Sequence, residues 1–171
     1  MGGSAASYRR AGALASRLCH HRRVLHIRPA TPSDLEFVVA GNLALAEETE
    51  NLVLDAAILR EGVRALLEGR APGAYWIAEL DGTPVGQTLI TYEWSDWRNR
   101  MIWWIQSVFV SSGARQHGVF RAIYTLLRTE AAAAGAGGLR LYVDTTNVRA
   151  QRVYAALGMN GDHYRVFEDM F

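Results

Sequence analysis

The ten residues 101–110, MIWWIQSVFV, constrain the fold more than any other stretch of the sequence. They are apolar on both alternating faces, a pattern typical of a strand that lies inside a sheet and is covered on both sides. Such a strand needs a packing layer on each of its faces. The run therefore favours a layered fold over a sheet with one face open to water.

Strand and helix patterns follow one another along the chain in an order that suits such a sheet. Runs typical of strands occupy 24–30, 75–80, 84–94, 101–110, 139–143 and 163–171. Helical spacing begins at Thr31, at Asp55, near Gly118 and after Asn147. We therefore expect an α/β fold, a mixed α+β sheet with helices on both faces.

The composition predicts one globular domain over residues 24–171. The chain has 171 residues, of which 50% are hydrophobic and 20% charged, enough apolar material for one core. The formal net charge of +1 argues against a nucleic-acid partner. No run approaches the length of a membrane span, so we expect no membrane partner. Monomer and homodimer both remain open.

Residues 1–23 differ in composition from the rest of the chain. They carry five arginines and the only cysteine, Cys19, and no acidic residue precedes Asp34. This composition is typical of an organellar transit peptide, and equally of a disordered tail or an over-extended start site. We expect a cytoplasmic protein, with organellar import through this extension as the alternative. Without a cysteine in the domain, we expect neither a cysteine nucleophile nor a metal site.

The stretch 113–127, GARQHGVFRAIYTLL, passes from a basic loop into a helical pattern. The start of a helix leaves about four backbone N–H groups unpaired and carries roughly half a positive charge, which suits an anion. Arg115 and Arg121 add full charges, and Gly118 permits close approach. The stretch favours a pyrophosphate site; an ordinary solvated loop before a helix is the alternative.

At this point the chain resembles the Gcn5-related N-acetyltransferase (GNAT) superfamily. The family signature is Arg or Gln, two residues, Gly, one residue, then Gly or Ala, placed between a central strand and a helix. Here it reads Arg115 to Phe120, and Phe120 departs from the pattern at the last position. Further matches are the opening IRPATPSDL, the turn DGTPVG and the late block NVRAQRVYAALGM, so the resemblance covers nearly all of 24–171.

The resemblance implies a GNAT-like acyl-CoA N-acyltransferase fold that uses acetyl-CoA as cosubstrate. Family members hold the pantetheine arm in a wedge between the central strand and its parallel neighbour. The residues expected to bind CoA on this basis are Val108, Phe109, Val110, Arg115, Gln116, His117, Gly118, Val119, Phe120, Arg121 and Asn147. We expect the Phe120 ring to point away from the phosphates and to join the core row of Val119 and Ile123.

Tyr154 occupies the family's general-acid position near the thioester sulfur. The alternative for Tyr154 is a core aromatic on a helix, beside Val153 and Leu157. A phenol titrates near 10 and a thiol near 8.5, so hydrogen bonding to the leaving thiolate is as suitable a role as full protonation. Because the domain lacks a cysteine to carry an acetyl group, we expect direct transfer.

The general base is not evident in the sequence. Many relatives keep a carboxylate on the central strand, whereas this chain has Ile105-Gln106-Ser107. Glu93 at the end of the preceding strand is the nearest candidate, although a solvated hairpin charge is the simpler interpretation. A water held by Gln106, Ser107 or backbone carbonyls is an equal alternative.

The acceptor site is expected at the other end of the wedge. The candidate acceptor residues are the acids Glu47 and Glu48 and the aromatics Tyr92, Trp94 and Trp104. They suit a small cationic amine such as a diamine, a polyamine or a basic amino acid. A solvated helix end and cross-strand aromatic pairs would explain them equally. Acetylation of a protein α-amine or lysine, and a CoA-binding regulatory module without catalysis, remain open.

Overall fold

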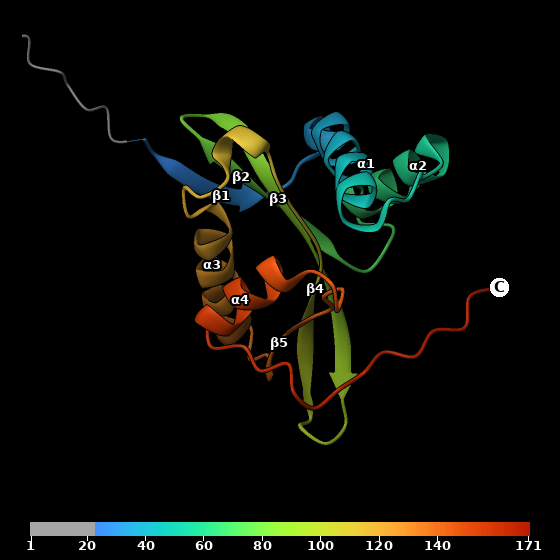
Figure 1. Cartoon of the computed structure of the whole chain (residues 1–171), viewed down its shortest axis with the longest axis vertical. Helices are drawn as coiled ribbons and strands as arrows, with labels where there is room; N and C mark the ends of the chain where they lie inside the picture. The colour runs from blue at the N-terminus through green and yellow to red at the C-terminus, as the bar shows by residue number, and fades with distance from the viewer. Residues whose placement is uncertain (1–22) are drawn as a thin grey trace, which may run out of the picture.

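The computed structural model describes residues 23–171 and contains one five-stranded sheet (Figure 1). The expected tail, residues 1–23, lies outside these residues except for Arg23. The strands are β1 (Leu25–Pro29), β2 (Ala74–Leu80), β3 (Thr83–Ser95), β4 (Arg100–Val110) and β5 (Gly138–Leu141), in that spatial order. The pairs from β1 to β4 are antiparallel, and β5 is parallel to β4.

Helices cover both faces of this sheet. They are α1 (Leu35–Glu50), α2 (Ala56–Leu67), α3 (Val119–Ala133) and α4 (Val148–Ala156). One core cluster joins α1 and α2 to one face through Val38, Val63 and Ile77, and the other joins α3 to the opposite face through Ile105 and Ile123 (Figure 1). The expected mixed sheet with two helical layers is confirmed. Within residues 23–171, no helix has the length and apolarity to cross a membrane.

The first two helices begin close to Thr31 and Asp55, where the sequence predicts their starts, and a carboxylate lies at each. Asp34 Oδ2 accepts the backbone N–H of Thr31 at 2.7 Å and completes the capping box. A 3-10 turn over Pro32–Asp34 intervenes, so that α1 itself starts at Leu35. Asp55 Oδ1 accepts the backbone N–H groups of Ala57 and Ile58, at 2.8 and 3.0 Å, and so fixes the start of α2.

The middle of β4 contains a β-bulge that changes the pairing of the sheet. Leu89 on β3 pairs with Ser107 and Ile90 pairs with Ile105, so Gln106 is an extra residue without a partner on β3. On its other edge, β4 pairs with β5 only as far as Ile105, which lies opposite Leu141. Beyond this point the two parallel strands separate, and residues 106–110 have a free edge.

The strand expected at 163–171 is absent. Residues 159–171 form no strand, and the side chains of Tyr164, Phe167 and Phe171 are exposed. In Figure 1 this segment first passes across the hairpin of β3 and β4 in the view and then extends away to the C-terminus. An alternating pattern makes a strand only where a neighbouring edge supplies hydrogen bonds, and β5, with four residues, offers a short one.

Candidate active site

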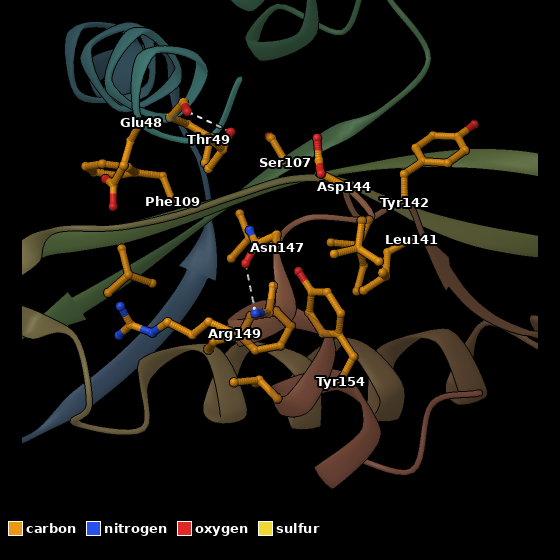
Figure 2. Close-up of a pocket in the computed structure, with 18 of the residues that line it drawn as sticks. Glu48, Thr49, Ser107, Phe109, Leu141, Tyr142, Asp144, Asn147, Arg149 and Tyr154 are labelled. Atoms are coloured by element: carbon orange, nitrogen blue, oxygen red, sulfur yellow. Dashed lines mark hydrogen bonds between the residues drawn. The ribbon is translucent and has the colours of Figure 1, made fainter. Parts of the chain in front are cut away.

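A pocket follows the free edge of β4 (Figure 2). Residues 105–110 of β4 form one wall, and Leu141 at the end of β5 with the following residues 142–144 forms the other. The last turns of α1 border the pocket from one face of the sheet, while α3 and α4 border it from the other. The wedge expected between the central strand and its parallel neighbour is therefore present.

Several residues expected to bind CoA lie together along this pocket. They are Val108, Phe109, Val110, Arg115, Phe120 and Asn147, and Tyr154 joins them from α4. The other expected residues, Gln116, His117, Gly118, Val119 and Arg121, form the turn and first residues of α3 beside the pocket, and Val119 is buried in the core.

The turn before α3 presents its backbone to an anion. Gln116 and Gly118 adopt left-handed conformations, with φ of 67° and 77°. Gly118 precedes the first residue of α3, and no side chain caps this helix. Uncapped N–H groups at a helix start are a natural site for phosphate. This backbone fits the pyrophosphate of a CoA molecule.

Arg115 holds the turn against α1. Its guanidinium donates to both carboxylate oxygens of Glu48, at 2.5 and 2.6 Å, and its Nε donates to the Val110 carbonyl at 2.9 Å. The Arg115 hydrogen bonds hold the pKa of Glu48 below its usual value, and Arg149 contributes to this shift through its charge. Glu48, expected at the acceptor site, instead pairs with Arg115 at the end of the pocket beside the signature turn.

Arg149 on α4 is a pocket residue that the sequence analysis missed. It follows Asn147 by two residues, in the same block that resembles the family. The sequence feature that could have identified Arg149 is its position as a basic residue close to the helix-capping residue Asn147. With Arg115, it makes this end of the pocket the more basic one.

Tyr154 extends from α4 with its hydroxyl in the pocket (Figure 2). Burial raises the pKa of Tyr154 above its usual value of 10, so the phenol is protonated at neutral pH. Phe120 contributes to this burial, because its ring meets the Tyr154 ring edge-on at 5.5 Å. Our expectation that Phe120 joins the core row of Val119 and Ile123 was wrong, since its ring borders the pocket.

Asn147 lies where it can both cap α4 and bind a ligand in the pocket. Its Oδ1 accepts the backbone N–H of Ala150 at 3.0 Å and so caps α4. The residue also borders the pocket, where its amide N–H groups can donate to a ligand.

Glu93, the candidate base, lies outside the pocket. Its carboxylate accepts hydrogen bonds from the Trp104 indole at 2.6 Å and from Arg140 at 2.9 Å. Both oxygens thus have partners within the sheet, and neither reaches the free edge of β4. The structure does not place Glu93 where it could take a proton from an acceptor.

The aromatic residues expected to bind the acceptor also lie elsewhere. Trp104 stacks on Tyr142 with ring centroids 4.6 Å apart, and the Arg140 guanidinium lies 5.6 Å from its ring. Tyr92 packs edge-on against Trp103 on the outer part of the hairpin. Neither Trp94 nor Glu47 borders the pocket. Cross-strand packing accounts for Tyr92, and Trp104 packs against Tyr142 with the Arg140 guanidinium over its ring.

Asp144 supplies a carboxylate at the pocket that the sequence analysis missed. It follows β5, and its Oδ1 accepts the backbone N–H and the hydroxyl of Thr146, both at 2.6 Å. These two hydrogen bonds lower the pKa of Asp144, so it is anionic at neutral pH. The signal was its place in a loop after a parallel strand, where ligand sites are common in open α/β sheets. Tyr142 and Glu50 border the same pocket.

Across residues 23–171, no three His, Cys, Asp or Glu side chains form a group that could hold a metal ion.

The five-stranded mixed sheet, with its parallel pair of strands separating beside an uncapped helix start, is the fold of the acyl-CoA N-acyltransferases to which this chain is similar. This chain belongs to the acetyltransferase (GNAT) family, whose model matches residues 44–159. The resemblance inferred from the sequence is thereby confirmed. The protein is an N-acetyltransferase, and acetyl-CoA is the acetyl donor that the family uses.

Solved structures show the same relationship. A possible acetyltransferase from Clostridium difficile 630 is 36% identical, with a TM-score of 0.79 over 86% of this chain and 97% of that one. The fold is shared with the aminoglycoside N-acetyltransferase AAC(6')-Iy in complex with CoA, at 17% identity and a TM-score of 0.74 over 90% of this chain and 99% of that one.

A third similar structure, a ribosomal-protein-alanine N-acetyltransferase from Brucella melitensis biovar Abortus 2308, is 16% identical. Its TM-score is 0.69, over 86% of this chain and all of the other. Comparison with curated proteins gave no match. At these identities, the second and third structures establish the fold alone.

Proposed function

We propose that this N-acetyltransferase transfers the acetyl group of acetyl-CoA directly to a primary amine of a small cationic acceptor. The observation that carries the proposal is the Asp144 carboxylate, which is anionic and borders the free edge of β4. Both hydrogen bonds from Thr146 go to Oδ1, and Asp144 is exposed, so a ligand can reach its carboxylate.

The pocket has two ends of different chemistry. Arg115, Arg149 and the start of α3 gather at one end, where Val110 leads into the signature turn. In Figure 2, Glu48 lies towards one end, whereas Asp144 and Tyr142 lie towards the other. The basic end suits the phosphates of CoA, and the peptide groups of 106–110 suit an extended pantetheine arm. The acetyl group would then lie towards Asp144.

Tyr154 would act on the leaving group. The C–N bond forms as the C–S bond breaks, and the phenol donates its hydrogen bond, or its proton, to the departing sulfur. Its raised pKa keeps that proton on the oxygen throughout the neutral range.

Asp144 suits an anchor better than a base. A carboxylate whose pKa lies below its usual value holds a proton weakly, but it attracts an ammonium group over the whole physiological range. An acceptor with two amines could place one ammonium at Asp144 and present the other, as a neutral amine, to the thioester. Diamines, polyamines and basic amino acids have this form.

An amine panel tests the proposal. Release of CoA would be followed with a thiol reagent, using diamines of increasing length and monoamines of matched length. We expect higher kcat/KM for the diamines. Asp144→Asn should lower kcat/KM for diamines about tenfold and leave kcat/KM for monoamines unchanged.

Asp162→Asn is the matched control, because Asp162 is exposed and lies outside the pocket. Peptides with free N-termini form a further arm of the panel. Equal rates for diamines and monoamines, or faster acetylation of peptides than of any small amine, would overturn the proposed acceptor class. Binding of acetyl-CoA without acetyl transfer to any amine would refute direct transfer.

A further inference from the structure

Ser107 carries a buried hydroxyl that has no hydrogen-bond partner among residues 23–171. Its main chain is fixed, because the Ser107 carbonyl accepts the Thr88 hydroxyl at 2.7 Å. Leaving a buried polar group unpaired costs about 1–3 kcal/mol. Where a protein retains such a group at the wall of a pocket, a ligand that completes the hydrogen bond is a physical explanation.

The two faces of β4 place Ser107 on the α1 side of the sheet. Val108 packs with the core beneath α3, whereas the Phe109 ring meets Phe37 of α1 at 6.4 Å. Ser107 and Phe109 are two residues apart, and therefore share a face. Tyr154 comes from α4 on the other side, where it contacts Phe120. Figure 2 shows Ser107 and Tyr154 on opposite sides of β4.

We propose that the Ser107 hydroxyl binds the acceptor amine, accepting one of its N–H groups and directing the nitrogen lone pair at the thioester carbon. The inference rests on the proposed function and assigns a residue to the nucleophile's side of that site. Tyr154 serves the leaving sulfur from the α4 side, which leaves the α1 side, where Ser107 and Glu50 border the pocket, for the amine.

The serine orients the amine and takes no proton from it, since a hydroxyl at neutral pH is a hydrogen-bonding group and not a base. As the C–N bond forms and the C–S bond breaks, the proton lost by nitrogen passes to water, and Tyr154 donates its hydrogen bond, or its proton, to the departing sulfur. Ser107 borders the pocket, and its side chain can rotate about χ1 among staggered positions to turn the hydroxyl towards a ligand there.

Ser107→Ala provides the test. We expect kcat/KM for the acceptor to fall about tenfold, consistent with the loss of one hydrogen bond to the reacting amine. The Kd of acetyl-CoA, measured by calorimetry, should stay within twofold of the wild-type value. The unfolding midpoint should be unchanged or higher, because the substitution removes an unpaired buried polar atom. Ser107→Thr keeps the hydroxyl and should retain more acceptor kcat/KM than Ser107→Ala.

Ser95→Ala is the control, since Ser95 is also a buried strand serine but lies at the far end of β3, outside the pocket. Unchanged acceptor kcat/KM in Ser107→Ala would overturn the inference. So would weaker acetyl-CoA binding at unchanged acceptor KM, which would assign the hydroxyl to the acyl group, or a lower unfolding midpoint, which would make it structural. Failure of the proposed function would appear earlier, as a wild-type enzyme with no preference among amines.

Discussion

Phe120 sets the surroundings of the proposed general acid. The family signature has Gly or Ala at this position, where a large side chain would face the pocket. Here the ring packs edge-on against Tyr154 and lies 6.4 Å from the ring of Tyr124. The departure from the signature therefore forms an apolar wall behind the phenol, and burial of that phenol raises its pKa.

Tyr154→Phe should lower kcat much more than it weakens the binding of acetyl-CoA. The substitution keeps the ring that packs against Phe120 and removes only the hydroxyl. We expect kcat to fall about a hundredfold, at the low end of what a general acid contributes. The Kd of acetyl-CoA should change less than twofold. Steady-state kinetics with thiol detection and calorimetry measure the two quantities.

Tyr124→Phe is the matched control for this prediction, because Tyr124 belongs to the same aromatic group but does not border the pocket. It should retain wild-type kcat. Wild-type turnover in Tyr154→Phe would instead assign Tyr154 to the core, the alternative that its helix neighbours suggest.

At the level of secondary-structure elements, most of the correct predictions came from local sequence patterns. The two-sided apolar run correctly identified β4, and the helix starts predicted at Thr31 and Asp55 lie close to the observed starts of α1 and α2. Both signals depend on side-chain spacing and on the nearest backbone groups. They need no knowledge of what lies across the fold.

What the sequence did not reveal depends on partners that are distant in the chain. Glu48 was expected to bind the acceptor, but it pairs with Arg115, 67 residues away. Glu93 was a candidate base in the sequence, but in the structure its two carboxylate oxygens accept hydrogen bonds from Trp104 and Arg140. Spacing cannot tell a free carboxylate from a paired one. Asp144 was missed because its loop carries no periodic pattern.

The contact of α1 with the sheet depends on a glycine. A Cβ added at Gly41 would lie 2.9 Å from both Gln87 Nε2 and Phe109 Cδ1. Gln87 is fully buried and donates to the Val38 carbonyl and to Asn42, so it has little room to move. Gly41→Ala should lower the free energy of unfolding by about 1–3 kcal/mol, measured by urea denaturation.

Gly62→Ala in α2 is the control, because no atom lies within 4 Å of the added Cβ. Alanine in a helix interior should raise the free energy of unfolding by about 0.5–1 kcal/mol. A Gly41→Ala protein as stable as Gly62→Ala would show that α1 can move outward at no cost. The Phe109 wall of the pocket would then be less rigid than the packing implies.

For the whole molecule, the sheet is shared by two cores. Ile77 belongs to the cluster beneath α1 and α2, and Ile105 to the cluster beneath α3. Both clusters pack on the same hydrogen-bonded sheet. We therefore expect that disruption of one cluster exposes the other to water, and that the domain unfolds as one cooperative unit. An interaction that joins elements should then contribute to the stability of the entire fold.

Arg28, Asp34 and Glu79 form such a junction. Arg28 on β1 donates to both oxygens of Asp34 at the start of α1, at 2.8 and 2.9 Å, and to Glu79 on β2 at 2.8 Å. Asp34 is 5% exposed. The hydrogen bond from Arg28 is the largest contribution that lowers the pKa of Asp34 from 3.8 to about 2.

This shift makes stability depend on pH with a definite sign. Because the folded pKa lies below the unfolded one, the contribution of Asp34 is complete above about pH 5 and is lost as pH falls towards 2. The shift corresponds to about 2 kcal/mol at pH 7 and about 1 kcal/mol at pH 3. Asp34→Asn should therefore lower the free energy of unfolding by about 2 kcal/mol at neutral pH, and by progressively less in acid.

Urea denaturation of both proteins from pH 7 to pH 3, followed by tryptophan fluorescence, measures this convergence. Asp162→Asn, at an exposed position, should show no such pH-dependent difference from the wild type. A constant gap between Asp34→Asn and the wild type would mean that geometry at the capping box, and not charge, makes Asp34 stabilising. If the gap closes on acidification, the charge at this one junction of β1, β2 and α1 stabilises the whole cooperative unit that carries the pocket.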